Sequence, residues 1–476
     1  MVHMEEGVRT IYVGMDQALV RIDLMRERLL VAALRHPTIL FRALDWSLEG
    51  GKARVKIEIA NRATLDVAHL PYNQELLSLL KEERAAGLKL VLVTAVPYEW
   101  AQSISRHLGL FDHVLATDET SGNISGERKL EVILQDANGK AFGYAGDASD
   151  DLPIWEVSQL PIMVGGRVKL AGKQAEKAVH LPRKESKALS WWKALRPSQW
   201  IKNVLVFAPA IAAHRVDKLW PNGCLAFLAF SLVASALYLW NDICDIDEDR
   251  IDPVKRLRAL AGGSIRPSRA LIVAALLLLV AGSAALCLPL DYSLVLIGYI
   301  IGIILYTSFF KNVMGLDLIT AAALLSTRVF AGGAACGVHV SIVLFAYIFL
   351  LALSLAHLKR YTELRRRIKY GIESIGRFTY AADKVSLLMK MGLCSGLTSV
   401  LVLAVYVAGS QAAPLYKTPA LLFVVGGLSF YWIERIWSLA RREKITGDLY
   451  DFLAADPVTY LVGLVSLAVV WIASIY

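Results

Sequence analysis

Hydrophobic and polar positions divide the chain into two dissimilar parts. Before the polar segment 171–195, short apolar runs alternate with mixed, charged stretches. From Trp200 onwards, long apolar runs are separated by short charged loops. The first pattern is typical of a globular α/β domain and the second of a polytopic membrane protein.

Three buried strands are predicted in the first part. They lie near residues 11–20, 88–93 and 141–147, and a helix is predicted from Tyr98 to Leu108. Strands that alternate with helices favour a doubly wound α/β domain, whose ligands bind at the carboxyl ends of the strands.

Those strand ends resemble motifs of the haloacid-dehalogenase superfamily of phosphotransferases over roughly residues 8–170. The resemblance implies that Thr94 holds a phosphate oxygen and that Lys129 neutralises the phosphate. Asp147 and Asp151 match the superfamily's pair of Mg²⁺-binding acids.

The first motif departs from the superfamily pattern D-x-D-x-T. Aligned on Asp16, the nucleophile position is Gly14 and the threonine position is Ala18. Glycine cannot form an aspartyl phosphate, so we expect a degenerate phosphatase that serves scaffolding, regulation or homo-oligomerisation. Residues 21–85 would hold the cap insertion. A residual Mg²⁺ site at Asp16 and the two matching acids stays open beside the alternative of leftover folding residues.

Nine apolar segments in the second part are long enough, or nearly long enough, to cross a bilayer. They lie near residues 201–214, 222–241, 269–288, 291–310, 316–336, 340–358, 384–408, 418–438 and 457–475. We therefore expect a haloacid-dehalogenase-like α/β domain (1–180), a linker with an interfacial aromatic–basic helix (181–199) and an all-α membrane domain (200–476).

Composition supports a membrane protein. Of the 476 residues 56% are hydrophobic, and the mean hydropathy is +0.48. The net charge of +9 is attributed to membrane topology and anionic ligands, and no pattern of a nucleic-acid-binding motif stands out. The five cysteines form no C-x-x-C pair, and no cleaved signal peptide is expected.

The basic loops predict the orientation of the spans. Lysine and arginine are concentrated in the second-to-third, sixth-to-seventh and eighth-to-ninth connections. By the positive-inside rule, these loops and the N-terminal domain lie in the cytoplasm, and the C-terminus lies outside.

One stretch at the end of the second span carries the candidate chemistry. Asn241 and Asp242 are followed by Asp245 and Asp249. If the helix continues through this stretch, the three aspartates share one face, where hard oxygen ligands suit Mg²⁺. A solvated helix end is the alternative, but a span precedes this cluster, and Lys255, Arg256 and Arg258 follow it.

Three further polar stretches lie at predicted span ends. Lys202 and Asn203 open the first span, where an interfacial anchor is the alternative to ligand binding. Tyr306 and Lys311 end the fourth span, where a lone lysine can simply snorkel. The sixth span ends in Lys359, Arg360, Tyr361 and Glu363, and helix-surface pairing between Lys359 and Glu363 is the alternative there. Asp317 and Arg328 lie inside the fifth span and are functional candidates on that ground.

Over residues 190–476 these motifs resemble the UbiA superfamily of intramembrane prenyltransferases. The most specific element is the family's N-D-x-x-D-x-x-x-D, which begins here at Asn241. Most members carry a second acidic motif in the sixth-to-seventh loop, but this loop is basic. That departure, together with the basic motifs, is similar to the decaprenyl-phosphate phosphoribosyltransferase branch, whose members often carry a haloacid-dehalogenase-like domain.

The resemblance implies a Mg²⁺-dependent transferase of the bacterial plasma membrane. It would move 5-phosphoribosyl from phosphoribosyl diphosphate to a polyprenyl (decaprenyl) phosphate and release diphosphate, for arabinan cell-wall precursors. The implied metal ligands are Asp242, Asp245 and Asp249, and the implied catalytic residues are Asp242, Asp245, Lys202, Lys359 and Arg360. The implied substrate-binding residues are Asn203, Asn241, Lys255, Arg256, Arg258, Tyr306, Lys311, Tyr361 and Glu363.

Three other functions stay open. One is a bifunctional enzyme whose N-terminal domain removes the 5-phosphate from the product, although Gly14 argues against it. An aromatic or quinone polyprenyltransferase would take a prenyl diphosphate donor and needs the second acidic motif. A transporter or lipid-binding protein would place its charges at the bilayer midplane in interrupted helices.

Overall fold

The computed structural model describes residues 7–35, 38–62, 65–118, 122–165, 170, 173–182, 186–371, 382–409, 412 and 415–475. By internal contacts the chain forms two compact units. The first is Met1–Ala194 with Asp242–Leu271, and the second is Leu195–Asn241 with Ile272–Tyr476. This division places 242–271, which the predicted boundaries assign to the membrane domain, with the N-terminal residues.

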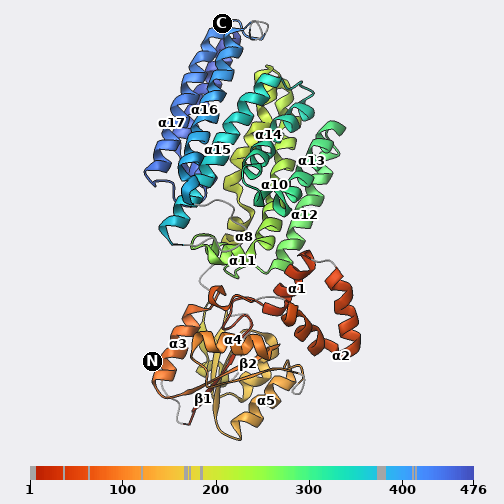
Figure 1. Ribbon diagram of the computed structural model, residues 1–476. Helices are drawn as coiled ribbons and strands as arrows, with labels where there is room; N and C mark the ends of the chain where they lie inside the picture. Colours follow the sequence, from red (N-terminus) through yellow and green to blue (C-terminus); the bar gives the residue numbers. More distant parts are fainter. Residues whose placement is uncertain are drawn as a thin grey trace. The chain divides into compact units, whose positions relative to one another are not determined.

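The first unit contains a parallel sheet of six strands in the order β3-β2-β1-β4-β5-β6 (Figure 1). The strands are β1 (Thr10–Gly14), β2 (Lys89–Pro97), β3 (His113–Thr117), β4 (Phe142–Gly146), β5 (Leu160–Val164) and β6 (Val179–Leu181). The predicted strands correspond to β1, β2 and β4, which are adjacent in the centre of the sheet. The predicted helix from Tyr98 to Leu108 is α4. The α/β fold class is thus confirmed.

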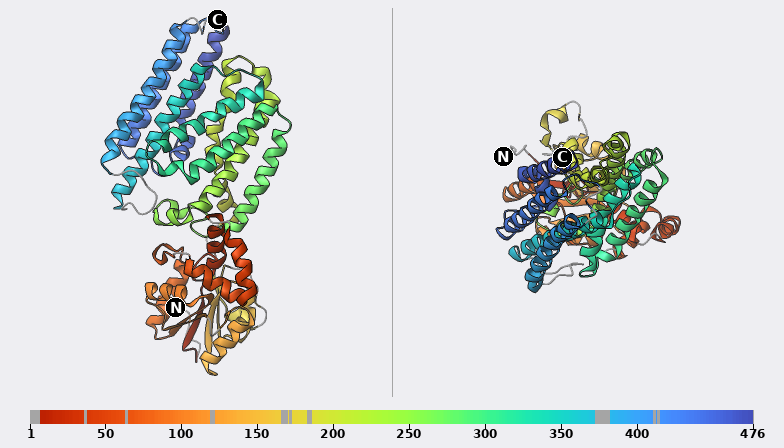
Figure 2. Two further views of the ribbon diagram at one scale, coloured as in Figure 1. Left: turned by 45° about the vertical axis from the view of Figure 1, so that its right-hand side comes forward. Right: turned by 90° about the horizontal axis from the view of Figure 1, so that it is seen from above.

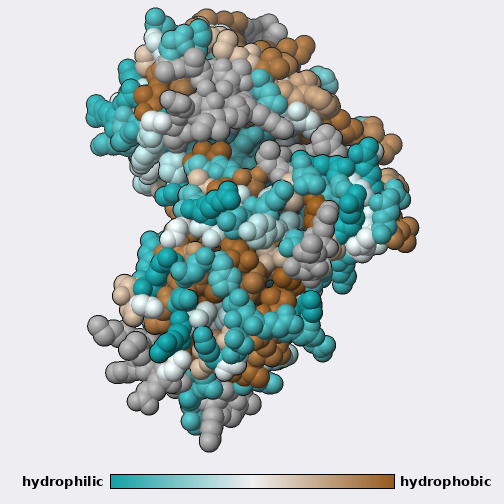
Figure 3. Space-filling model, turned by 60° about the horizontal axis from the view of Figure 1, so that its bottom comes forward, coloured by the Kyte–Doolittle hydropathy of each residue, from teal (hydrophilic) through white to brown (hydrophobic). Residues whose placement is uncertain are grey.

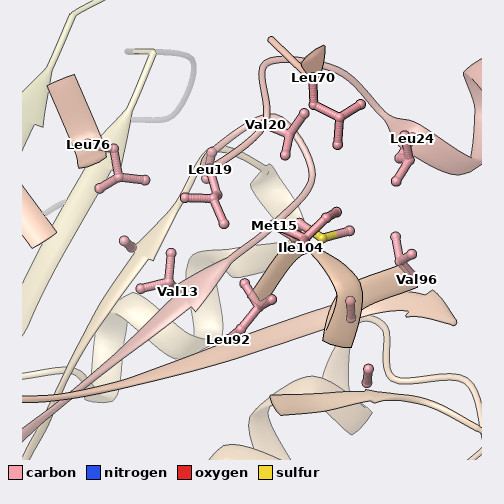
Figure 4. Packing of buried hydrophobic residues seen from close by; sticks show 14 of the residues in the cluster. Val13, Met15, Leu19, Val20, Leu24, Leu70, Leu76, Leu92, Val96 and Ile104 are labelled. Carbon is pink, nitrogen blue, oxygen red and sulfur yellow. The ribbon is translucent and has the colours of Figure 1, made fainter. Parts of the chain in front are cut away.

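Side chains of the central strands alternate between two cores, because successive residues of a strand point to opposite faces. Val13 and Leu92 lie in one core with Leu76 of α3 (Gln74–Ala85) and Ile104 of α4 (Figure 4). The other core joins the opposite face to α5 (Glu127–Ala137) and α6 (Leu152–Val157). Burial on both faces explains why these strands are nearly continuous apolar runs.

Helices connect β1 to β2 where the cap insertion was predicted. They are α1 (Leu24–Arg35), α2 (Thr38–Arg62), η1 (Val67–His69) and α3. The first unit also contains the 3-10 segment η2 (Ser149–Asp151), α7 (Lys173–Lys177) and most of α8 (Lys187–Leu195). The predicted aromatic–basic helix is α8. Residues 242–271 contribute α11 (Ile246–Ile251) and η6 (Lys255–Leu257).

The second unit is a bundle of long apolar helices (Figures 1 and 2). Its main helices are α10 (Cys224–Cys244), α12 (Pro267–Ala285), α13 (Leu290–Ser308), α14 (Leu316–Cys336), α15 (Ile342–Lys369), α16 (Val385–Ala408), α17 (Leu422–Arg441) and α19 (Pro457–Ile475). Helix α15 packs against α14 and α16, and α17 packs against α16 and α19. Short α18 (Leu449–Ala455) and η7 (Phe310–Asn312) lie between long helices.

Eight helices of the described residues are long and apolar enough to cross a membrane. They correspond to the second to ninth predicted spans. The first predicted span, 201–214, is not among them. It forms η3 (Pro197–Phe207), a 3-10 helix, and α9 (Ala208–Ala212), followed by the short segments η4 (Val216–Lys218) and η5 (Leu219–Gly223). The segment was predicted as a span from its apolar composition, and composition does not distinguish a long α-helix from 3-10 and short helical turns.

Large apolar side chains are exposed along the spanning helices. Leu279 of α12 is 68% exposed and Leu464 of α19 is 65% exposed. In Figure 3, brown hydrophobic residues form patches among teal hydrophilic ones. Exposed apolar surface of this extent is unfavourable in water and matches helices that face lipid.

Candidate active site

The acidic stretch does not form one continuous helix. Helix α10 ends at Cys244, and Asp245 has φ −99° and ψ 11° before α11 begins at Ile246. The amide of Asp249 still donates to the carbonyl of Asp245, at 2.8 Å. The premise that Asp242, Asp245 and Asp249 follow a single helical repeat is therefore wrong, because the helix breaks between the first and the last of them.

Tertiary contacts nevertheless bring two of the aspartates to one cation. Arg258 Nη1 lies 2.7 Å from Asp249 Oδ2 and 3.4 Å from Asp242 Oδ1. Asp242 and Asp249 are each 3% exposed. Burial and the nearby Asp242 carboxylate raise the pKa of Asp249 to about 6, although Arg258 acts in the opposite direction.

The carboxylates of Asp242 and Asp249 are ligands of the kind that a divalent cation such as Mg²⁺ prefers. Within the described ranges, no group of three or more His, Cys, Asp or Glu side chains is arranged as a metal site. Asp245 is half-buried at the start of α11. Mg²⁺ is commonly held by one or two carboxylates and completes its shell with water and substrate phosphates, so two adjacent carboxylates suffice.

The basic residues that follow have different surroundings. Asp252 accepts hydrogen bonds from the backbone amides of Val254 and Lys255, at 2.9 and 3.0 Å, which fixes the start of η6. The Lys255 side chain is half-buried, and Arg256 is exposed.

In the second unit, Lys202 is the centre of a polar cluster. Its ammonium donates to Gln199 Oε1 at 2.9 Å and to the Tyr238 hydroxyl at 2.8 Å. It also lies 3.8 Å from the ring centroid of Tyr450, within range of a cation–π interaction. Arg196 lies 5.2 Å from the centroid of Tyr238, so two cations flank this ring.

Segments far apart in the sequence complete this group, which we call the cation cluster: Arg196, Lys202 and Lys359, with Tyr238, Tyr450 and Asp448. Lys359 Nζ lies 3.9 Å from Asp448 Oδ2, and Asp448 caps α18 by accepting from the Tyr450 amide. Burial opposes ionisation of Asp448, but Lys359 and Lys202 lower its pKa to about 2. Asp448 is thus a carboxylate at neutral pH.

The pKa of Lys202 is lowered as well. This residue lies outside the eight spanning helices, and burial lowers its pKa well below the ordinary value. Asp448 opposes this effect, whereas Lys359, Arg328 and Arg196 reinforce it. Because these neighbouring cations disfavour the ammonium form of Lys202, an anion bound beside it would stabilise that form.

The other predicted basic residue of this region has acidic partners. Arg360 donates to Asp317 Oδ2 through Nε at 3.0 Å and Nη2 at 2.6 Å, and to Glu363 Oε2 at 3.1 Å. Tyr361 is buried and packs edge-on against Trp437. The structure therefore brings Arg360 and Glu363 together, with Asp317 as the second acidic partner of the guanidinium.

Asn203 is held by a buried arginine of α14. Arg328 Nε donates to Asn203 Oδ1 at 2.8 Å, and Asn203 Nδ2 donates to Ser231 at 2.9 Å. Asn241 accepts from Thr307 at 3.3 Å. Tyr306, at the end of α13, and Lys311, in η7, are both half-buried.

Sequence reasoning left Tyr238, Asp448 and Tyr450 out of the site. Tyr238 did carry a signal, because it precedes Asn241 by three residues and therefore lies on the same side of α10. No local signal marked Asp448 or Tyr450. Their placement depends on how α18 folds back against η3, where Ser198 donates to Asp451 at 2.7 Å.

At the strand ends of the haloacid-dehalogenase-like domain, the position of the expected nucleophile is a glycine in tight surroundings. A Cβ at Gly14 would lie 3.2 Å from both the Tyr144 hydroxyl and the carbonyl of Ala145. The Tyr144 hydroxyl donates to Asp151 at 2.7 Å, and Lys129 lies 2.8 Å from the same carboxylate oxygen. Thr94 and Asp147 are buried near the strand ends.

Comparison with known families identifies both parts of the chain. A model of the UbiA prenyltransferase family matches residues 204–450, which is over half of the chain. The chain belongs to the UbiA prenyltransferase family. A model of haloacid dehalogenase-like hydrolases matches residues 9–156, so the N-terminal domain is haloacid-dehalogenase-like. Both resemblances drawn from the sequence are confirmed, and the protein is a UbiA-type intramembrane prenyltransferase.

Three relatives differ in how much of the chain they match. The uncharacterized protein y4nM of Sinorhizobium fredii is 32% identical over 94% of this chain and 88% of its own length. The nodulation protein NoeC of Azorhizobium caulinodans is 27% identical over 56% of this chain and 88% of its own. Decaprenyl-phosphate phosphoribosyltransferase of Mycobacterium tuberculosis is 34% identical over 38% of this chain and 61% of its own.

Among solved structures, a UbiA homolog from Archaeoglobus fulgidus bound to DMAPP and Mg²⁺ has a TM-score of 0.46 at 17% identity. The match covers 60% of this chain and 98% of that chain.

Proposed function

We propose that this UbiA-type enzyme transfers 5-phosphoribosyl from phosphoribosyl diphosphate to a polyprenyl phosphate. The observation that supports this donor is the cation cluster. Arg196, Lys202 and Lys359 gather there. The sixth-to-seventh loop, which carries a second acidic motif in most of the family, lacks that motif in this sequence. A donor with a 5-phosphate and an acceptor with its own phosphate need cations in the site.

The segment of residues 242–266, which we call the acidic loop, is proposed to hold the leaving group. Asp242 and Asp249, with Asp245 beside them in the sequence, are the residues that would hold Mg²⁺. Bound there, Mg²⁺ would stabilise the negative charge that develops on the leaving oxygen. Arg258, already between two of these carboxylates, is placed to pair with phosphate oxygens. Lys255 and Arg256 add positive charge to the same loop.

The reaction needs no general base. The bond from C1 of the ribose to the diphosphate oxygen breaks, and the bonding electrons leave with the diphosphate. A phosphate oxygen of the lipid forms the new bond to C1. Because that oxygen is already ionised at neutral pH, no proton has to be removed from it. The lysines of the cation cluster orient the anions and offset their mutual repulsion.

The active site and the N-terminal domain are proposed to lie on the cytoplasmic side of the plasma membrane. Lysine and arginine concentrate in loops that the positive-inside rule assigns to that side. A water-soluble sugar diphosphate made in the cytoplasm would reach the enzyme there.

A donor comparison tests the proposal. The purified protein in lipid nanodiscs is incubated with Mg²⁺, ribose-labelled phosphoribosyl diphosphate and polyprenyl phosphate, and a parallel sample receives a labelled prenyl diphosphate with an aromatic acceptor. We expect label in the lipid fraction of the first sample. Product in the second sample alone would favour the aromatic prenyltransferase and contradict the proposal.

A further inference from the structure

The acidic loop is tied to helix α1 of the haloacid-dehalogenase-like domain, within the same compact unit. Arg250 donates to both oxygens of Glu27, at 2.7 and 2.9 Å. The two side chains are 4% and 1% exposed. The same guanidinium donates from Nε to the carbonyl of Ala261 at 3.1 Å, so one residue joins α1 to both ends of the loop.

A second ion pair lies beside the first. Arg28 Nη2 is 2.6 Å from Asp247 Oδ1 and 3.1 Å from Glu27 Oε1, and Arg28 is itself buried. A lone buried charge is strongly unfavourable, so the buried residues Glu27, Arg28 and Arg250 depend on their partners in this network.

The backbone of the loop also packs closely on this domain. Gly263 has φ +75°, and a Cβ there would lie 2.9 Å from Arg21 Cβ and 3.0 Å from Ile22 Cγ2. Arg266 donates to Gln17. Both contacts fall on the segment after β1, where Asp16 accepts from the amide of Leu24 at 3.0 Å and so fixes the start of α1. The segment that corresponds to the first phosphatase motif therefore packs against residues 263–266.

We propose that the degenerate phosphatase domain is a built-in positioning module of the transferase. It holds residues 245–266 in the conformation in which Arg258 joins Asp242 and Asp249. Glu27 and Arg28 are positioning residues, because they act on the reaction only through the loop. The inference rests on the proposed function for its consequence in catalysis, whereas the ordering of the loop can be measured without any turnover.

Hydrogen–deuterium exchange of the full chain in nanodiscs tests the ordering. The variants are Glu27→Gln, which leaves the Arg250 charge uncompensated, and the double variant Glu27→Met/Arg250→Met, which removes both charges. Glu131→Gln is the matched control, since Glu131 pairs with Arg128 at 2.7 Å on the surface. Alongside exchange, we would measure the Mg²⁺ concentration for half-maximal transfer and the KM for polyprenyl phosphate.

We expect Glu27→Gln to raise exchange in peptides covering 245–266 by at least about tenfold, because the buried pair opposes local opening. Strands β1 and β4 should exchange as in the wild type. The Mg²⁺ requirement should rise while the KM for the lipid stays unchanged, and the double variant should be less affected than Glu27→Gln. The control should match the wild type throughout.

Two results would overturn the inference. One is wild-type exchange of the loop and a wild-type Mg²⁺ requirement in Glu27→Gln. The other is faster exchange spread equally over β1, β4 and the loop and not relieved in the double variant, since that would be general loss of folding. Absence of phosphoribosyl transfer in the wild type would contradict the proposed function instead, and the exchange data would still decide whether the domain orders the loop.

Discussion

Replacement of Lys202 by methionine should weaken the binding of anionic substrates without preventing folding. The ammonium of Lys202 lies among the amide of Gln199, two phenols and the cations of the cluster, with Asp448 as its acidic neighbour. Methionine keeps most of the side-chain volume and removes the charge. We expect the variant to fold and insert normally and to lose transfer activity.

The size of the loss follows from the contact that would be removed. A hydrogen bond between a charged group and its partner contributes about 1.5–3 kcal/mol, which corresponds to a loss of about ten- to a hundredfold in kcat/KM. Most of this loss should be in KM for whichever substrate phosphate Lys202 binds. The loss should be smaller in Lys202→Arg, which keeps the charge.

The pH dependence of KM gives a second readout. Because burial lowers the pKa of Lys202, this residue loses its proton at a lower pH than an ordinary lysine. An anion binds the protonated form, so KM should rise with pH above that pKa, and Lys202→Arg should remove the rise because guanidinium does not titrate. The groups that face Lys202 are Arg196, Tyr238, Arg328, Lys359, Asp448 and Tyr450.

The free energy of unfolding should also rise with pH. Between the lowered pKa and the ordinary lysine pKa of 10.5, the unfolded chain binds more protons at Lys202 than the folded protein does. Folding stability contributed by this residue therefore rises with pH across that window. Steady-state transfer and thermal unfolding from pH 6 to pH 10 measure both effects, with exposed Lys187→Met as control. Unchanged kcat/KM in Lys202→Met, with a pH profile like that of the wild type, would refute the assignment.

Three further changes test other parts of the account. Asp242→Asn should reduce Mg²⁺-dependent transfer by roughly a hundredfold or more while membrane insertion persists, measured by transfer assay and fractionation. Gly14→Asp should not restore phosphate release from p-nitrophenyl phosphate and should lower the unfolding temperature, because the Tyr144 hydroxyl and a backbone carbonyl confine the new side chain. Asp448→Asn should lower the free energy of unfolding by about 2 kcal/mol at neutral pH, because the folded protein stabilises the ionised form of Asp448 and so lowers its pKa. This difference from the wild type should vanish as the pH falls from about 4 to about 2, where Asp448 takes up its proton.

The elements that sequence predicted correctly are those with strong local patterns. The buried runs of β1, β2 and β4 and the amphipathic α4 carry their periodicity within a single window. Strand β3 has partly exposed residues, and β6 has only three residues, so neither stands out from a loop. The apolar run at 201–214 predicted a span but folded as 3-10 and short helical turns, with Pro197 at the first position of η3.

The site shows the limit of local reasoning more clearly. The acidic motif was visible because its residues are neighbours in sequence. Glu27 and Arg250 are 223 positions apart, and each looks like an ordinary charged residue of an amphipathic helix. Their pairing depends on the folded unit, as does the approach of Asp448 to Lys359. The sequence likewise predicted positive charge near the acidic motif, but it did not predict that Arg258 would contact both Asp242 and Asp249.

A donor labelled at two positions tests the central claim most directly. Phosphoribosyl diphosphate carrying one label in the ribose and another in the β-phosphate is incubated with the nanodisc protein, Mg²⁺ and polyprenyl phosphate, and the lipid and aqueous phases are counted. The account predicts that the ribose label enters the lipid phase and the β-phosphate label stays in water as diphosphate, in the wild type and not in Asp242→Asn. Both labels remaining in the aqueous phase, or both entering the lipid together, would contradict it.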